Sequence, residues 1–171
     1  MKIQHVSKFF IFLLSGTISF SVYSQIDYIK NRCEQSGYEI ATIYQVGDLE
    51  KLIKPSDWVI KNCKNYLRPD FYYSFYNDRA LGKKATLDLK GALSDVNYCI
   101  SEKYDIVSCH VTKARVLLEL GKKDEYKIEK EISLKMIDIK NREADDRYNP
   151  TSRDSIIYLN NSLKDLLNSM P

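Results

Sequence analysis

Few side chains in this sequence have the type and spacing that nucleophilic chemistry needs. Cys109 and His110 are adjacent, and a thiol beside an imidazole is the pair that a cysteine nucleophile uses. Neighbouring residues on a helix point about 100° apart, so these two side chains are badly placed to share a proton. We therefore expect His110 to be a surface or turn-packing residue. The chain contains no G-x-S-x-G, HExxH or phosphate-binding glycine loop.

Acidic side chains offer a second kind of chemistry. A polymer hydrolase needs only two carboxyl groups that meet in space, and Asp145 with Asp146, or Glu129 with Glu131, are candidate pairs. Charged residues at this density are more typical of a solvated helix face. We expect a protein that is not an enzyme, and keep a small hydrolase of envelope polymers as the alternative.

The cysteines favour disulfides over metal binding. The chain has four, Cys33, Cys63, Cys99 and Cys109, and none forms a CxxC pair. After residue 24 the only histidine is His110, so a zinc site is not expected, and neither is a cofactor. An even number of cysteines in an exported chain is typical of disulfides, and three pairings are open.

The first residues have the three-part layout of a cleaved secretory signal. Lys2 and Lys8 are followed by the apolar stretch Phe9 to Val22 and then by a small-residue site before Gln25. Polar and small residues interrupt the apolar stretch, which is too short to span a bilayer comfortably. An uncleaved membrane anchor is the alternative.

We therefore expect residues 1–24 to be a signal peptide and residues 25–171 to form one compact mature domain. This domain is expected to be periplasmic or secreted, without stable membrane insertion after cleavage. Loss of Lys2 and Lys8 lowers the formal charge from +3 to +1, so the positive field that nucleic-acid binding needs is missing. A protein partner is expected instead.

The mature chain has helical spacing almost throughout, and no alternating runs are joined by a hairpin signal. The clearest helix is predicted over residues 107–120. Its buried stripe consists of Val107, Val111, Ala114 and Leu118. Gly121 is expected to end this helix, and Asp124 to cap the next one, from residue 125 to about residue 141.

Helices are also predicted before and after this pair. Pro69 is expected to end the helix that carries Trp58, and Asp70 to cap an aromatic helix that begins FYYSFYNDRAL. The inner face of its antiparallel partner consists of Ala92, Val96, Cys99 and Ile100. A last helix after Pro150 is expected to place Leu159 inside and Asn160 outside, and to seal the end of the fold.

Small residues recur at a spacing that resembles the tetratricopeptide repeat. Ala80 and Ala114 are 34 residues apart, which is the period of that family. With Ala92 and Cys99 they suit points where two helix axes approach closely. The stretch GALSDVNYCI, followed by KARVLLELGKKDEY, resembles the second helix of one unit leading into the first helix and turn of the next.

The resemblance implies an all-α fold, in which antiparallel helix pairs stack as a short tetratricopeptide-like solenoid with a C-terminal capping helix. Tyr126 departs from the family pattern, which prefers a small residue there, and an unrelated helical bundle is the alternative. In such a stack Cys99 ends one helix and Cys109 starts the next, which implies a disulfide between them. Cys33 and Cys63 would then form the second pair.

The aromatic helix is the predicted contact surface, together with the groove formed by the first helices. Aromatic residues occupy five of the six positions 71–76, more than one helix face holds, so some are expected to be exposed. The alternative is that they are ordinary core. The residues expected to bind a partner are Tyr72, Tyr73, Tyr76, Arg79 and Lys113. The predicted function is a protein-binding module, as an adaptor or as a toxin-neutralising immunity protein; a purely structural subunit is a further possibility.

Overall fold

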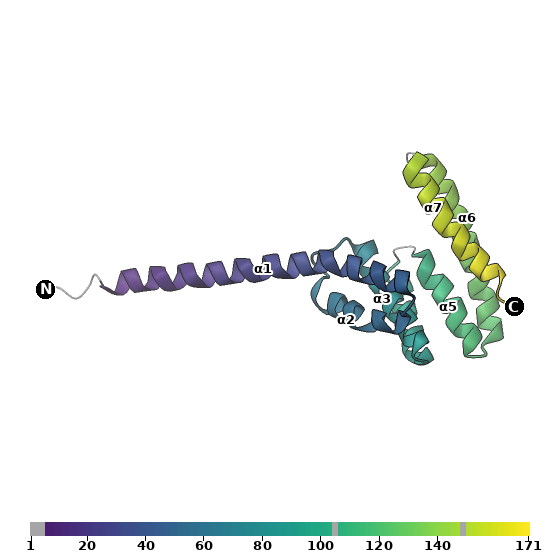
Figure 1. Ribbon diagram of the computed structural model, residues 1–171, viewed down its shortest axis with the longest axis horizontal. Helices are drawn as coiled ribbons and strands as arrows, with labels where there is room; N and C mark the ends of the chain where they lie inside the picture. The colour runs from purple at the N-terminus through teal and green to yellow at the C-terminus, as the bar shows by residue number, and fades with distance from the viewer. Residues whose placement is uncertain (1–5, 104–105, 148–149) are drawn as a thin grey trace.

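The computed structural model of the chain describes residues 6–103, 106–147 and 150–171, and side chains from Gln25 onward except at 146–151. These residues form seven α-helices and one short 3-10 helix, without a strand (Figure 1). The helices are α1 (Val6–Val46), η1 (Leu49–Leu52), α2 (Ile53–Asn62), α3 (Pro69–Ala85), α4 (Leu89–Ser101), α5 (Val107–Glu119), α6 (Lys123–Arg147) and α7 (Pro150–Asn168). The predicted all-α class is confirmed.

Each helix packs mostly against its neighbours in the chain. α3 pairs with α4, α5 with α6, and α6 with α7, while α3 also contacts α5 and α5 contacts α7. Successive helices run antiparallel, and α6 and α7 lie side by side at the end of the fold away from α1 (Figure 1). This stacking is consistent with a helical array.

Small side chains lie where the central helices meet. Ala80, Ala92 and Ala114 are fully buried, and Cys99 is 1% exposed. Ala80 and Ala92 share one buried cluster with valines of α4 and α5. A larger side chain at these points would hold the helix axes apart. The prediction that these four residues are buried is confirmed.

Gly121 ends α5 as predicted. Its φ is +73°, a left-handed conformation that glycine adopts without steric cost. The N–H of Lys122 donates to the carbonyl of Leu117, and the N–H of Gly121 donates to that of Leu118, each at 3.0 Å. These two bonds are the Schellman motif, which satisfies carbonyls at the helix end.

Two predicted caps and one predicted helix end are wrong. Asp70 and Asp124 lie within the first turns of α3 and α6 and are not the residues that precede them. Pro69 is the first residue of α3, so it begins a helix instead of ending α2. Proline suits this position because its missing N–H is one that has no partner in a helix anyway.

The segment predicted to be a signal peptide lies in the first half of α1, which projects away from the other helices (Figure 1). Residues 1–5 lie outside the described residues, and only the backbone is described for residues 6–24. Further along α1, Cys33 and Ile40 are buried in the core. None of the described helices combines the length and the apolarity that a membrane crossing requires.

The last helix packs on the core through Leu163, Leu166 and Met170, but differs from the prediction at Leu159 and Asn160. Leu159 is 61% exposed, whereas Asn160 is 7% exposed and Leu167 is fully buried. The side-chain amide of Asn160 donates to Oδ1 of Asn141 on α6 at 2.8 Å. This hydrogen bond compensates for burying the amide, so α7 can turn a polar residue toward α6.

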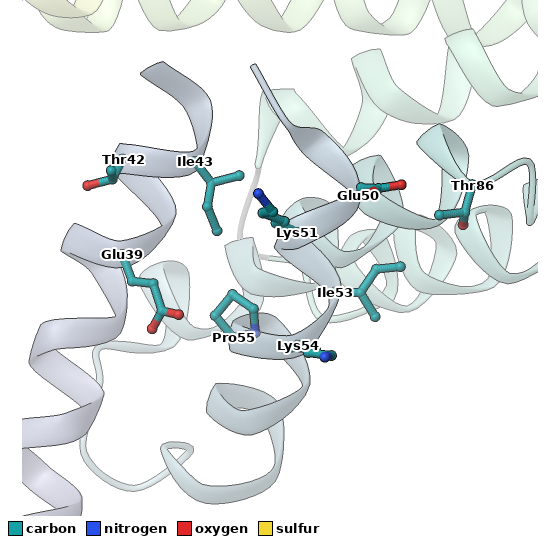
Figure 2. A pocket seen from close by; sticks show the side chains of 9 residues that line it. All are labelled: Glu39, Thr42, Ile43, Glu50, Lys51, Ile53, Lys54, Pro55 and Thr86. Atoms are coloured by element: carbon teal, nitrogen blue, oxygen red, sulfur yellow. The ribbon is translucent and has the colours of Figure 1, made fainter. Parts of the chain in front are cut away.

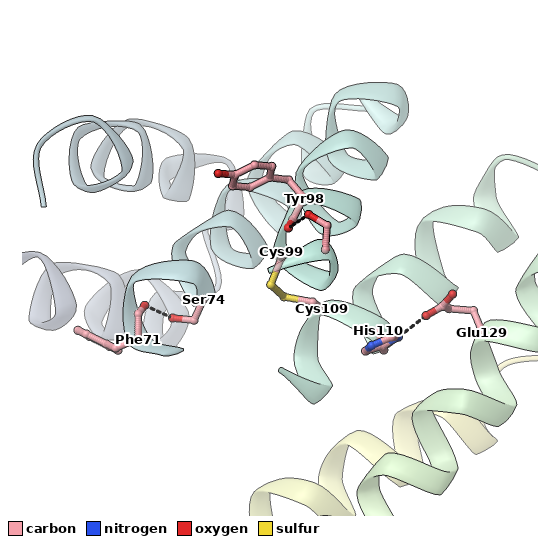
Figure 3. Close-up of a disulfide and its surroundings, with 8 residues drawn as sticks. Phe71, Ser74, Tyr98, Cys99, Cys109, His110 and Glu129 are labelled. Carbon is pink, nitrogen blue, oxygen red and sulfur yellow. Dashed lines mark hydrogen bonds and ion pairs between the residues drawn. A yellow bond between two sulfur atoms is a disulfide. The ribbon is translucent and has the colours of Figure 1, made fainter. Parts of the chain in front are cut away.

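Two disulfides cross-link the helices, with the pairing that the resemblance implied. Cys33 of α1 is bonded to Cys63 at the end of α2, with Cα atoms 5.7 Å apart. Cys99 of α4 is bonded to Cys109 of α5, with Cα atoms 6.4 Å apart (Figure 3). Disulfides persist in oxidising compartments, so these bonds point to an extracytoplasmic environment.

The two disulfides are expected to differ in their effect on stability. Cys33→Ala/Cys63→Ala opens a loop with a sequence separation of 30 and should lower the free energy of unfolding by about 4 kcal/mol. Cys99→Ala/Cys109→Ala opens a loop with a separation of 10 and should cost about 3 kcal/mol. Urea denaturation monitored by circular dichroism measures both values. Two variants as stable as the wild type would show that neither bond forms in solution.

Candidate binding site

The tyrosines predicted to bind a partner lie largely inside the molecule. Tyr72 and Tyr73 are 4% and 6% exposed, and the hydroxyl of Tyr72 donates to the carbonyl of Ile60 at 2.8 Å. Tyr76 is half-buried and packs against Tyr98 of α4, with ring centroids 4.6 Å apart. Tyr72 and Tyr73 therefore lie in the core, as the alternative for the aromatic helix had it.

Arg79 connects three helices. Its guanidinium donates to both carboxylate oxygens of Asp95 on α4, at 2.9 and 2.6 Å, and to Asp57 on α2 at 2.7 Å. It also lies 5.2 Å from the centroid of the Tyr76 ring. Burial alone would lower the pKa of Arg79, but its hydrogen bonds with the two carboxylates raise it overall. Arg79 is thus engaged within the chain, as a link between α2, α3 and α4.

Lys113 belongs to a cluster that joins α5 to α6. Glu129 is only 4% exposed, and one of its carboxylate oxygens lies 2.5 Å from Nδ1 of His110 (Figure 3). The other carboxylate oxygen lies 2.8 Å from Nζ of Lys113. Burial alone would raise the pKa of Glu129, but hydrogen bonds with His110 and Lys113 hold it below the usual value. Cys109, next to His110, is in a disulfide and so supplies no thiolate in this structure. The sequence carried no signal for this cluster, because Glu129 lies on another helix.

Tyr44 connects α1 to α3. Its hydroxyl donates to Oδ1 of Asp78 at 2.6 Å. Burial raises the pKa of Asp78 to about 6, although the hydrogen bond from Tyr44 acts in the opposite direction. The bond holds the C-terminal part of α1 against the central helices.

A pocket of about 880 Å³ opens beside this part of α1 (Figure 2). Three elements surround it, α1, η1 and α2, and the C-cap of α3 completes the wall. The lining residues are Glu39, Thr42, Ile43, Glu50, Lys51, Ile53, Lys54, Pro55 and Thr86. Aliphatic side chains therefore alternate with charged ones of both signs around one cavity.

Packing behind the pocket keeps its walls in place. A Cβ atom built on Gly82 of α3 would lie 2.7 Å from Cγ1 of Ile53, so only glycine allows α2 to approach α3 this closely. The Cys33–Cys63 bond holds α1 against α2 from the other side. At the rim, Lys51 is paired with Asp48 at 2.6 Å. The cavity is thus built on fixed helices.

The lining of the pocket contains few groups for acid–base or nucleophilic chemistry. Its lining contains no histidine, cysteine or serine, and Glu39 and Glu50 are its only acids. These two carboxylates stand on different elements and do not point toward one another in Figure 2. Within the described part of the chain, no three side chains of His, Cys, Asp or Glu are grouped to hold a metal ion.

Sequence reasoning missed this site. Nothing in the sequence pattern of residues 38–46 shows that Thr42 and Ile43 face a cavity. The usable signal is the break at Gly47, followed by a new helix with Pro55, which brings two short elements back against α1. Comparisons with protein-family models, curated protein sequences and solved structures give no significant match.

Glu129 is expected to stabilise the protein in a pH-dependent way. Glu129→Gln should lower the free energy of unfolding at neutral pH by about 3 kcal/mol, because His110 and Lys113 lose their buried anion. Since the pKa of Glu129 is lowered in the folded state, the wild-type advantage should shrink as the pH falls below the unfolded value of 4.5. Urea denaturation of both proteins at pH 3 and 7 measures this difference in the free energy of unfolding. A wild-type advantage that grows toward pH 3 would refute the lowered pKa of Glu129.

Asp78 should show the opposite dependence. Its folded pKa of about 6 exceeds the unfolded value of 3.8, so the folded state holds this proton more tightly. Relative to Asp78→Asn, the wild type should therefore lose stability as the pH rises from 3.8 to about 6, and then stay constant. Thermal unfolding of the wild type and of Asp78→Asn across this pH range measures the difference in their stability. A difference that is independent of pH would contradict the raised pKa.

Proposed function

We propose that the mature chain is an exported protein-binding module that holds an aliphatic side chain of its partner in the pocket between α1, η1 and α2. One observation carries the proposal, a cavity of about 880 Å³ that combines Ile43, Ile53 and Pro55 with charged side chains at its rim. Ligand pockets in proteins are mostly apolar, with a few polar groups that fix orientation.

The charged side chains around the pocket restrict the kind of partner segment that fits it. Glu50 and Lys54 supply one negative and one positive charge, whereas Glu39 is already paired with Arg32 at 3.2 Å and Lys51 with Asp48 at 2.6 Å. A protein segment with an aliphatic residue flanked by both acidic and basic residues complements this lining. Complementary charges of this kind fix the register of a complex more than they add to its affinity.

The array of helix pairs supports a tetratricopeptide-like module, because stacked pairs expose grooves on rigid elements. Ala80 and Ala114 are buried 34 residues apart, at the period of that family. Adaptor and toxin-neutralising roles both require such a rigid surface and no catalysis. The signal-like N-terminus and the two disulfides support export to a periplasmic or extracellular site.

Blocking the pocket should abolish partner binding. Thr42 is exposed and lines the cavity, so Thr42→Trp fills the space without emptying the core. Ala41→Trp is the matched control, because Ala41 is exposed, adjacent on α1 and directed about 100° away from Thr42. The tagged proteins are used to capture partners from the producing organism's envelope, and the enriched protein is then purified for calorimetry.

We expect Thr42→Trp to weaken binding at least about tenfold, a loss of about 1.4 kcal/mol, and Ala41→Trp to leave it unchanged. Equal binding by both variants would refute the pocket. A hydrolase acting at this pocket would have Glu39 and Glu50 as its acids, in place of the pairs that the sequence offered. Release of sugars from an envelope polymer that both Glu39→Gln and Glu50→Gln abolish would replace the binding proposal.

A further inference from the structure

The outer face of α6 carries large aliphatic side chains that the described part of the chain leaves partly exposed. Ile128, Ile132 and Ile139 are 62%, 38% and 45% exposed. At about 100° per residue they lie within about 40° of one another around the helix. Ile137 and Ala144, on the opposite face, are buried. The inner face of α6 is thus already packed on α5 and α7, and the isoleucines form a separate stripe.

A row of exposed charged side chains runs beside the stripe. Its members are Asp124, Lys127, Glu131, Lys135, Asp138 and Arg142. They lie within about 80° of one another on the helix, and their signs alternate from the first to the last. Read in the reverse direction, the row shows the opposite sign at each place. A row with this property is complementary to an antiparallel copy of itself.

From this pattern we infer that α6 is a homodimer interface, in which the α6 helices of two copies pack antiparallel. A two-fold axis near residue 133 places Glu131 against Lys135 of the second copy. The same axis places Lys127 near Asp138 and Asp124 near Arg142. Ile132 meets its own counterpart there, and Ile128 meets Ile139. A single two-fold axis therefore pairs both the isoleucines and the charged side chains of the two copies.

The other flank of the stripe does not oppose this packing. Its two acids are paired within their own chain, Glu125 with Lys122 at 2.9 Å and Glu143 with Lys140 at 3.1 Å. Within its own chain, Asp138 of the row also accepts a hydrogen bond from Nζ of Lys164 on α7 at 2.8 Å. The Asp138 carboxylate still lies on the side of α6 that faces the row of the second copy. The flanks therefore carry balanced charges at the interface.

The size of the interface sets the strength of the dimer. One pair of helices covers less than the roughly 800 Å² per partner of a standard stable complex, so we expect a reversible dimer with a dissociation constant of about 10 µM. None of the residues that line the pocket lies on α6, so the dimer leaves the pocket accessible and does not depend on the proposed function.

Sedimentation velocity of the exported protein, from about 1 µM to about 1 mM, tests the proposal directly. We expect a concentration-dependent monomer–dimer equilibrium. Ile128→Lys should weaken it at least about tenfold, because it places a charge in the stripe. Leu159→Lys is the matched control, since Leu159 on α7 is 61% exposed and lies outside the stripe. It should leave the equilibrium unchanged.

Charge reversal then tests the orientation. Glu131→Lys and Lys135→Glu should each weaken self-association, because each brings like charges together across the axis. An equimolar mixture of the two variants should recover dimers, since both cross-axis pairs are restored. Mixing cannot repair an effect within one helix, so recovery is specific to contact between copies.

Three results would overturn the dimer. One is a protein that stays monomeric at about 1 mM, well above the expected dissociation constant. Another is the absence of recovery in the mixture, with helical circular dichroism intact in both variants. The third is a monomer whose Ile128→Lys variant loses binding to a captured protein, which would assign the stripe to a different partner.

Discussion

The close approach of α3, α4 and α5 is the contact on which the rest of the structure depends. Ala80 and Ala92 are fully buried there in one cluster with Val96 and Val116, and their short side chains let the helix axes come together without a cavity. Other helices are attached to this centre from both sides. Cys33–Cys63 and the Tyr44–Asp78 bond hold α1 on one side, and Glu129 holds α6 on the other.

Polar side chains act mainly as connectors between helices. Arg79 joins α2, α3 and α4, Lys84 pairs with Glu119 between α3 and α5, and Glu129 joins α5 to α6. The buried carboxylates of Asp95 and Glu129 each have cationic partners, which offset the cost of their desolvation. Charged residues that look available for a ligand in the sequence are therefore already used by the fold.

The two proposed binding surfaces lie on different helices. The pocket belongs to α1, η1 and α2, while the isoleucine stripe belongs to α6 near the other end of the stack (Figure 1). A pocket on one side and a self-complementary helix on the other would let two copies present two pockets in one assembly. Two linked sites bind a divalent partner more tightly than either does alone.

Helical elements, the end of α5 at Gly121 and the burial of the small residues could all be predicted from the sequence, because each follows from local spacing. The cysteines indicated disulfides through their even number in a chain that is expected to be exported. The burial of Tyr72, Tyr73 and Asn160 and the Glu129 cluster were decided by the tertiary structure. Which face of a helix meets a neighbour depends on residues far away in the chain, and adjacent residues such as Leu159 and Asn160 point about 100° apart. The pocket has the same origin, since its walls come from separate helices that only the packed fold brings together.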